Sequence, residues 1–188
     1  MKGRDLFRYF KPVIIFISLI FKIIPKKVFI WCWPILDLMP SYLGLTLRYL
    51  FAKRLAKKIG DNVSISRSVE ILNWNNLQLG TNVSIHKDCY IDAEGGISIG
   101  NDVSIAHAST ILSSNHTWND KSKPIRSNPL KKDAVTISND VWIGCAVRIM
   151  AGVNISSRCI IASGAIVTKD INKETLVAGI PSKLIKKI

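Results

Sequence analysis

The chain has 188 residues, of which 48% are hydrophobic and 21% are charged. This length can bury a core of its own, and the composition excludes a largely disordered chain. The net charge of +13 is uneven, because residues 1–58 hold 12 of the 26 Lys and Arg residues but only 2 of the 13 acidic residues. The four cysteines form no C-x-x-C pair, which argues against a zinc site or a disulfide framework and is consistent with the cytosol.

Residues 1–58 are predicted to be a basic, hydrophobic helical segment. Its two apolar runs, 13–24 and 28–39, are shorter than the roughly 18–20 residues that span a bilayer, and Pro25-Lys26-Lys27 separates them. No clean small-x-small cleavage site follows, as a secretory signal would require. We expect helices that lie at a membrane interface or re-enter it. A packed helical cap or protein interface, and a true membrane anchor, are the alternatives.

The stretch 41–58 is predicted to be a helix that Ser41 caps. Apolar residues recur along it at spacings of three or four, and basic residues fill other positions. The apolar set is Leu43, Leu47, Leu50, Phe51, Leu55 and Ile59, and the basic set is Arg48, Lys53, Arg54, Lys57 and Lys58. Such a helix suits an anionic leaflet, and a solvated basic face over a packed apolar one is the alternative. Nucleic acid is disfavoured because no nucleic-acid motif accompanies the charge.

From residue 59 onward, aliphatic residues recur every six positions. The anchors are Ile59, Ile65, Ile71, Leu79, Ile85, Ile91, Ile99, Ile105, Ile111, Ile137, Ile143, Ile149, Ile155, Ile161 and Val167. A strict period of six fits neither a helix nor a simple meander. It predicts a coil of short parallel strands with three flat faces, one hexapeptide per face. The anchors should point inward and form a continuous column.

Irregularities in the repeat locate the loops of this all-β domain, which is predicted over residues 59–188. Segments 73–77 and 93–96 each add two residues, and a long insert runs from about residue 113 to 134. The insert is polar and basic and contains two prolines, so it is predicted to be a surface loop. We expect the active site beside it.

Three segments resemble the hexapeptide-repeat acyltransferases, with the nearest similarity to the galactoside, maltose and polysaccharide O-acetyltransferases. Residues 141–147 are similar to the V-W-I-G signature of that family, 161–170 to its late coil, and 177–183 to its closing A-G-x-P-A-K segment. The resemblance implies a left-handed parallel β-helix, coenzyme A as a substrate, and trimers with active sites between neighbouring chains. It does not cover residues 1–58.

Acyl transfer to a hydroxyl needs a base near the acceptor proton, and histidine titrates near neutrality. His116 follows the coil that ends at residue 112, where the resembling family has its catalytic histidine. We therefore predict that His116 is the general base, with a polar loop residue as the alternative. The family match also puts His86 and Glu94 at acceptor-binding positions, where the family has Asn and Asp. Asp92 and Asn115 are further acceptor candidates, and the two departures put the small-sugar substrates of the family in doubt.

His107 should point outward from a coil, as a surface or subunit contact, with a site role as the alternative. Zinc bound by the three histidines, as in the hexapeptide-repeat carbonic anhydrases, is disfavoured because the sequence spacings are 21 and 9. No G-x-S-x-G motif is present, and Cys145 has no adjacent histidine. The prediction is direct transfer in a ternary complex, without a metal.

Coenzyme A is expected along a straight wall formed by the late coils. By family match, the Cys145 N–H stabilises the sulfur or the oxyanion. Lys169 and Lys183 supply charge for the phosphates, with a solvated surface charge as the alternative for each. The other predicted coenzyme contacts are Trp142, Ala162, Ser163, Gly164 and Thr168.

The leading prediction is an acetyl-CoA-dependent O-acetyltransferase that modifies a sugar hydroxyl in surface polysaccharide or lipid-linked glycan biosynthesis. It is expected to be a homotrimer in the cytoplasm, peripheral at the inner face of the membrane. N-acetylation of an amino sugar and a non-enzymatic trimeric scaffold are the alternatives.

Overall fold

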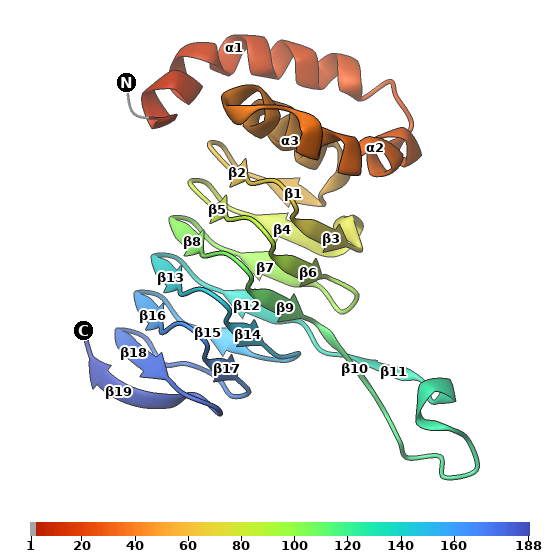
Figure 1. Cartoon of the computed structure of the whole chain (residues 1–188), viewed down its shortest axis with the longest axis vertical. Helices are drawn as coiled ribbons and strands as arrows, with labels where there is room; N and C mark the ends of the chain where they lie inside the picture. Colours follow the sequence, from red (N-terminus) through yellow and green to blue (C-terminus); the bar gives the residue numbers. More distant parts are fainter. Residues whose placement is uncertain (1–2) are drawn as a thin grey trace.

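The hexapeptide repeat forms three flat sheets that wind around one axis (Figure 1). This computed structural model describes residues 3–188. Each coil adds one strand to each sheet, and strands one coil apart pair in parallel and in register, as Ile85 does with Ile105. The parallel β-helix expected from the six-residue period is confirmed.

The strands are short, as expected for faces of one hexapeptide each. The first sheet contains β1 (Lys58–Ile59), β4 (Leu77–Leu79), β7 (Ile97–Ile99), β12 (Val135–Ile137) and β15 (Asn154–Ile155). The second contains β2 (Ser64–Ile65), β5 (Ser84–Ile85), β8 (Val103–Ile105), β13 (Val141–Ile143), β16 (Cys159–Ile161), β18 (Thr175–Ala178) and the antiparallel β19 (Lys183–Lys187). The third contains β3 (Glu70–Leu72), β6 (Tyr90–Asp92), β9 (Thr110–Leu112), β14 (Arg148–Ile149) and β17 (Ile166–Val167).

The anchors fill the interior of the coil. Six of them are each at most 2% exposed, namely Ile85, Ile99, Ile105, Ile143, Ile149 and Ile161. Burying such a side chain contributes roughly 1.5–3 kcal/mol, so the stacked anchors stabilise every coil against its neighbours. Their predicted inward orientation is confirmed.

Three edges join the sheets. The first edge connects the first and second sheets, the second edge connects the second and third, and the third edge connects the third and first. Along the first edge, Asn82 and Asp102 adopt φ of 59° and 57°, a conformation that Asn and Asp tolerate better than most residues. The Asn82 Nδ2 donates to Asp102 Oδ1 at 2.8 Å, and Asn62 Nδ2 donates to Asn82 Oδ1 at 2.8 Å. This ladder ties successive coils together.

The long insert leaves the third edge as an antiparallel arm, which projects clear of the coils (Figure 1). Its strands are β10 (Ser114–His116) and β11 (Leu130–Lys132), and its outer part holds the 3-10 helix η3 (Ile125–Ser127). The expectation of an exposed insert at this point is confirmed, and pairing between β10 and β11 adds regular structure that the composition of the insert did not indicate.

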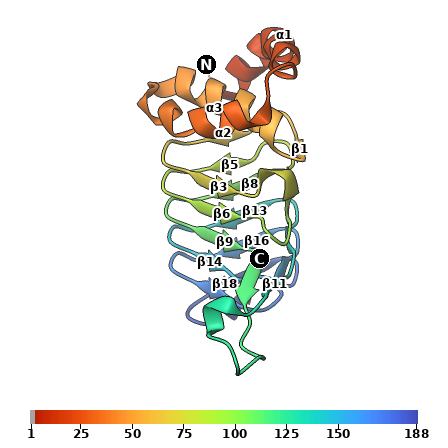
Figure 2. The same cartoon turned by 90° about the vertical axis from the view of Figure 1, so that its right-hand side faces the viewer.

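Helices cover the amino-terminal end of the coil stack (Figure 2). They are α1 (Gly3–Phe21), α2 (Lys26–Cys32), the 3-10 helix η1 (Pro34–Leu38) and α3 (Ser41–Leu55), which together we call the cap; η2 (Trp74–Asn76) lies in the first coil below. Ile14 and Phe29 of the cap are buried in the same core as the coil anchors. The Trp33 indole donates to Val69 O at 2.9 Å. The inner side of residues 3–55 is thus a packed cap.

Within residues 3–188, none of the helices combines the length and the hydropathy needed to cross a bilayer.

Three features of α3 differ from the expectation. The helix ends at Leu55 rather than at residue 58, and Lys58 begins β1. Ser41 is its first helical residue rather than its cap, because Pro40 occupies the capping position, and no side chain caps the helix. Arg48, expected to face an anionic leaflet or, in the alternative, solvent, is only 4% exposed and donates from Nε to Ile65 O at 2.7 Å and from Nη1 to Leu36 O at 2.8 Å. The physical reason is that β2 is the edge strand of the second sheet, so Ile65 O has no backbone donor within residues 3–188 and takes a side-chain donor from the cap.

Candidate active site

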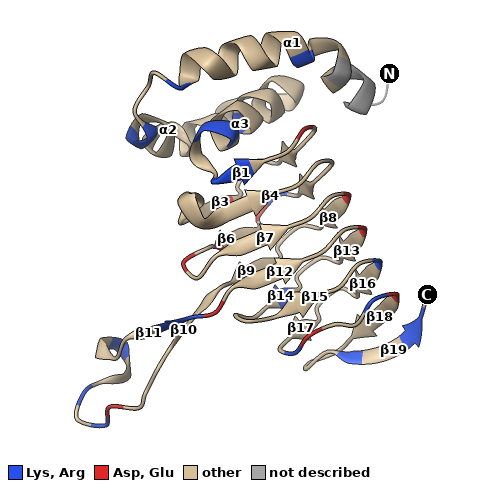
Figure 3. Ribbon diagram, turned by 180° about the vertical axis from the view of Figure 1, so that it is seen from behind, with Lys and Arg blue, Asp and Glu red and all other residues tan. Residues whose placement is uncertain are grey.

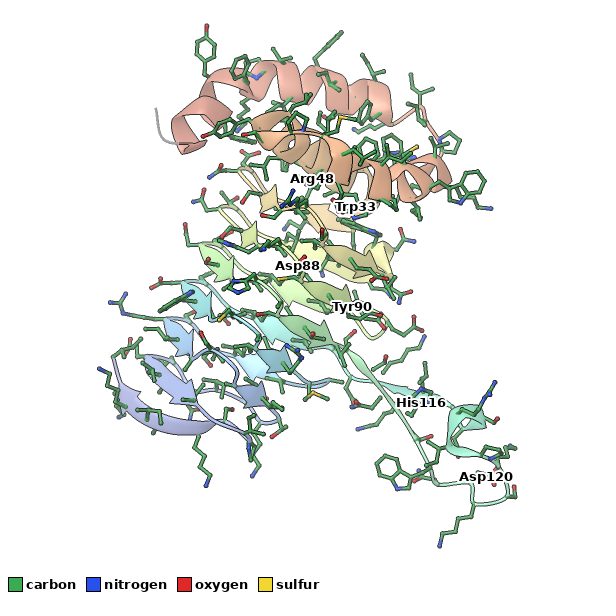
Figure 4. All side chains as sticks on the ribbon, viewed as in Figure 1. Trp33, Arg48, Asp88, Tyr90, His116 and Asp120 are labelled. Atoms are coloured by element: carbon green, nitrogen blue, oxygen red, sulfur yellow. The ribbon has the colours of Figure 1, made fainter. Side chains whose placement is uncertain are left out.

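His116 lies at the end of β10, on the arm and away from the coils of its own chain (Figure 4). Its side chain is exposed, and its backbone is held opposite Leu130 by the pairing of β10 with β11. The next residue, Thr117, donates from Oγ1 to Pro129 O at 2.6 Å. The candidate base therefore sits on a hairpin with a defined backbone.

Ser113 fixes the root of the arm, and the sequence interpretation missed this residue. It is 0% exposed, and its Oγ donates to Asp92 O at 2.8 Å and accepts from Gly95 N at 2.9 Å. A Cβ on Gly95 would come within 2.1 Å of Ser113 O, so the coil and the arm root are in direct backbone contact there. The only signal in the sequence was the position of Ser113 where the repeat breaks.

The two carboxylates predicted to bind the acceptor make contacts at or beside this root. Glu94 Oε1 lies 2.5 Å from Lys132 Nζ, which joins a coil to the base of β11. Asp92 Oδ1 accepts from Asn73 Nδ2 at 2.7 Å and from Glu94 N at 3.1 Å. Both carboxylates therefore hold the third edge in shape, whatever else they bind.

The outer part of the arm has its own hydrogen-bond network. The buried Asn128 amide accepts from Asp120 N at 3.0 Å and donates to Pro124 O at 3.2 Å. Hydrogen bonds from Ser122 and then from Lys123 lower the pKa of the Asp120 carboxyl group. Three large apolar side chains of the arm remain exposed, namely Trp118, Ile125 and Leu130.

The second edge presents a smooth wall made of small residues. His107 O accepts from Ala146 N at 2.9 Å, and Cys145 O accepts from Gly164 N at 2.8 Å, so His107, Cys145 and Ser163 occupy equivalent places in successive coils. Ala146 and Gly164 take φ of 55° and 73° at this edge. Because only small side chains stand at the coils of Cys145 and Ser163, backbone groups of this part of the wall are accessible to a long ligand.

The N–H of Cys145 is one such group. It makes no hydrogen bond to any residue in the described range, 3–188, whereas Gly144 N donates to Ile161 O at 2.8 Å and Ala146 N donates to His107 O at 2.9 Å. An unpaired donor at this wall is available to a ligand outside the coil. Gly144 makes the wall possible, because a Cβ there would lie 2.6 Å from Ser163 N.

The predicted site residues fall into two groups within one chain. The second edge holds His86, His107, Cys145, Ala162, Ser163 and Gly164. The third edge and its arm hold Asp92, Glu94, Asn115, His116, Thr168 and Lys169. Trp142 stands exposed on the outer face of the second sheet, and Lys183 begins β19. His107 is exposed, as expected.

The side chains described for residues of the 3–188 range include no cluster of three or more His, Cys, Asp or Glu that could hold a metal ion. Two of the three histidines lie on the second edge and the third on the arm, so they do not converge.

The architecture is that of the left-handed parallel β-helix acyltransferases. A galactoside acetyltransferase, solved in complex with coenzyme A, matches the structure with a TM-score of 0.76 at 26% identity, covering 87% of this chain and 78% of that chain. The galactoside O-acetyltransferase of Escherichia coli (strain K12) is 29% identical over 136 residues, which are 72% of this chain and 66% of that protein. A putative acetyltransferase of Staphylococcus aureus (strain MRSA252) is 33% identical over 128 residues, which are 68% of this chain and 63% of that protein.

The chain has the fold of the hexapeptide-repeat acyltransferases, and the resemblance stated from its motifs is confirmed. It spans slightly under two thirds of the length of the two curated relatives. No protein-family model matches it.

Proposed function

We propose that this protein is an acetyl-CoA-dependent O-acetyltransferase that acts on a sugar hydroxyl in surface polysaccharide or lipid-linked glycan biosynthesis. The observation that carries the proposal is the position of His116, an exposed imidazole on an ordered arm that extends beyond its own coils. The galactoside acetyltransferase bound to coenzyme A supports acetyl-CoA as the donor.

In the proposed reaction, the imidazole of His116 takes the proton from the acceptor hydroxyl as its oxygen attacks the thioester carbonyl. The Cys145 N–H donates to the negative charge that develops on the oxygen or the sulfur, and one such donor contributes about 2.7–4 kcal/mol to the transition state. The C–S bond then breaks, and the coenzyme thiolate takes up the proton that His116 carried. No covalent enzyme intermediate is needed.

We propose that the site forms between chains of a homotrimer. Within one chain, His116 and the Cys145 wall occupy different edges, so a second chain is needed to bring them together. The exposed apolar side chains of the arm, Trp118 and Ile125, suit a contact with a neighbouring chain. His116, Thr168 and Lys169 would come from one chain, and Cys145 and Ser163 from the next. A monomer in light-scattering measurements at working concentration would contradict this assembly.

The function is tested by supplying labelled acetyl-CoA with a panel of neutral sugars, amino sugars and oligosaccharides, and by locating the acetyl group by mass spectrometry and NMR. We expect an O-linked acetyl group on a sugar. Transfer confined to the amino group of an amino sugar would replace O-acetylation by N-acetylation. Absence of any transfer, together with no binding of coenzyme A, would favour the non-enzymatic scaffold.

Lys169→Ala and Lys183→Ala are expected to lower the affinity for coenzyme A more than the affinity for a pantetheine fragment that lacks the nucleotide phosphates. Both side chains are exposed, so they form salt-sensitive contacts with phosphate. Calorimetric titration of both ligands measures the difference, with Lys121→Ala, on the arm, as the matched control. Equal losses for the two ligands would show that these lysines do not contact phosphate.

We further propose that residues 1–58 attach the transferase, residues 59–188, to the cytoplasmic face of a membrane. Most of α1 consists of uncharged residues, as its mainly tan ribbon in Figure 3 shows. The exposed apolar side chains of the cap include Tyr9, Val13, Phe16, Ile20, Ile23, Ile30, Trp31 and Ile35. Apolar faces of this kind bury at the lipid headgroup boundary, with aromatic residues at the interface. The four cysteines are free, in keeping with a cytoplasmic location.

The structure corrects the set of basic residues expected to face lipid. Lys26 donates from Nζ to Leu55 O at 3.1 Å and to Asn75 Oδ1 at 2.7 Å, and Arg54 donates from Nε to Phe21 O at 3.1 Å. Together with buried Arg48, these side chains tie the cap together, because their long donors reach carbonyl groups at helix ends. Lys22 and Lys27 remain exposed at the turn between α1 and α2.

The combined substitution of Phe16, Ile23 and Trp31 by Ser is expected to lower vesicle affinity about tenfold or more, because three exposed apolar side chains no longer enter the interface. Sedimentation with anionic and neutral vesicles measures it, and the unmodified protein should prefer anionic vesicles at low salt. Ile185→Ser, an exposed apolar residue on β19, is the control. If the unmodified protein ignores both vesicle types, the outer side of the cap is not a membrane contact.

A further inference from the structure

A cleft of about 550 Å³ separates the cap from the upper coils along the second edge. The cap contributes Asp37 of η1 and Arg48 of α3. The edge contributes Arg67, His86 and His107, one from each of three successive coils. Lys87 also lines the cleft, and so does Ser41, the first residue of α3. The helix thus begins at the cleft, where first-turn N–H groups lack intrahelical partners.

Arg48 is the buried member of this cleft, and Figure 4 shows it between α3 and the first coils. Its Nε and Nη1 are used by Ile65 O and Leu36 O. The third nitrogen, Nη2, makes no hydrogen bond to any residue of the described range, 3–188. Every fully enclosed side-chain nitrogen or oxygen in that range does have a hydrogen-bond partner. Nη2 is therefore not sealed in the core, and the cleft is the opening that Arg48 lines. A buried guanidinium with a donor left over is equipped to bind an oxyanion.

Positive charge in the cleft exceeds negative charge. Burial lowers the pKa of Arg48, the Asp37 carboxylate raises it, and the neighbouring Arg67 lowers it again, so the two guanidinium groups repel each other. Asp37 does not neutralise both, because its Oδ2 accepts from Ser68 N at 2.9 Å and its Oδ1 lies 3.8 Å from Arg48 Nη1. Lys87 also lines the cleft, and Asp88 Oδ2, 3.8 Å from its Nζ, offsets part of that charge. A bound anion would relieve the remaining excess of positive charge.

We infer that this cleft binds the phosphate of the acceptor, so that the acetylated sugar is carried on a phosphate or diphosphate ester. The inference rests on the proposed function for its acceptor and adds the chemical class of that acceptor. Arg48 Nη2, the Arg67 guanidinium and the start of α3 are the donors, since planar guanidinium groups match phosphate oxygens. Sugar nucleotides and prenyl-diphosphate-linked sugars share this group.

The position of the cleft agrees with this assignment. Down the second edge, Arg67, His86, His107, Cys145 and Ser163 follow one another coil by coil, starting beneath the cap. A phosphate bound near Arg67 therefore leaves its sugar directed along the edge toward the coenzyme wall. The substitution of His86 where the family has Asn, noted in the sequence, falls inside this cleft.

The test uses inorganic pyrophosphate titrated into the full chain saturated with coenzyme A, so that the coenzyme site is already filled. We expect binding that weakens with salt. Arg67→Ala should lower the affinity about tenfold, as loss of a charged hydrogen-bond donor does. Asp37→Asn should raise it, because the amide keeps an acceptor for Ser68 N but removes the opposing charge. Arg158→Ala, at an exposed ion pair with Asp140 on the first edge, should leave it unchanged.

A kinetic arm separates the sources of the phosphate. We expect Arg67→Ala to raise KM about tenfold for a sugar nucleotide, a short-chain prenyl-diphosphate sugar, or both, and to leave KM for the free sugar unchanged. Absence of pyrophosphate binding, equal effects of Arg67→Ala and Arg158→Ala, or equal KM changes for free and phosphorylated sugars would overturn the inference. If no acceptor is acetylated, the titration still decides the phosphate site, and only the proposed function is lost.

Discussion

Replacing His116 by Ala should lower kcat by about 10²–10⁴, the range for removing a general base. Binding of coenzyme A should stay near that of the unmodified protein, because the predicted coenzyme contacts at Cys145 and Ser163 lie on a different edge of the chain. Steady-state kinetics with a saturating acceptor and calorimetric titration of coenzyme A measure the two effects separately.

The arm also carries candidate contacts between chains, so the variant must be shown to keep the oligomeric state of the unmodified protein. Lys121→Ala is the matched control, because Lys121 is exposed on the same arm. We expect unmodified kcat from this control. Turnover of His116→Ala at the level of the unmodified protein would rule out its role as the base.

The substitution Gly144→Ala should both destabilise the protein and lower its affinity for coenzyme A. An added Cβ would lie 2.6 Å from Ser163 N and 2.8 Å from its Oγ, distances that force the backbone of two successive coils apart. Overpacking of this kind costs about 1–3 kcal/mol. For a chain of this length, that loss corresponds to a fall in Tm of roughly 2–12 °C. Thermal unfolding and coenzyme titration test both effects.

Gly164→Ala, one coil further along the same wall, separates steric crowding from backbone strain. A Cβ at Gly164 meets nothing within 4 Å, but its φ of 73° is unfavourable for alanine. The cost should therefore be about 1–2 kcal/mol from conformation alone, and the wall should keep its shape. If Gly144→Ala and Gly164→Ala lower coenzyme affinity equally, the close approach of Gly144 to Ser163 is not what shapes the wall.

The six-residue period was enough to predict the β-helix and its inward residues. A period of six in the sequence is also a period in space, because equivalent positions stack from coil to coil. Two residues at these positions, Ile105 and Ile143, are completely buried. The position of the insert was predictable for the same reason, since a break in the period marks where the chain leaves the coil. The resemblance of residues 141–147 and 161–170 to known signatures added the handedness and the chemistry.

For the amino-terminal segment, the sequence pattern was not enough to predict how the helices pack. Its composition predicted helices, but not which side of each helix packs, because apolar residues occur on both the inner and the outer side of the cap. Ile14 is buried whereas Phe16 is exposed. Arg48 is the clearest case: its position in a basic helix indicated an anionic leaflet or solvent, yet it donates to two carbonyl groups inside the fold. Such contacts depend on which carbonyl groups lie nearby, and those belong to distant segments.

The sequence by itself therefore determined the coil, its core and the place of the arm, because each follows from local spacing, and the family resemblance added the candidate base. Only the tertiary structure decided that His116 and Cys145 lie on different edges, that Glu94 and Ser113 hold the arm root, and that Arg48 and Arg67 share a cleft. These arrangements join residues that are 17 or more positions apart, through turns whose geometry sets which side chains meet. Spacing along the chain carries no information on such contacts. Stacking of the coils brings Glu94 and Ser113 to the arm root, and packing of the cap on the first coil brings Arg48 to the cleft.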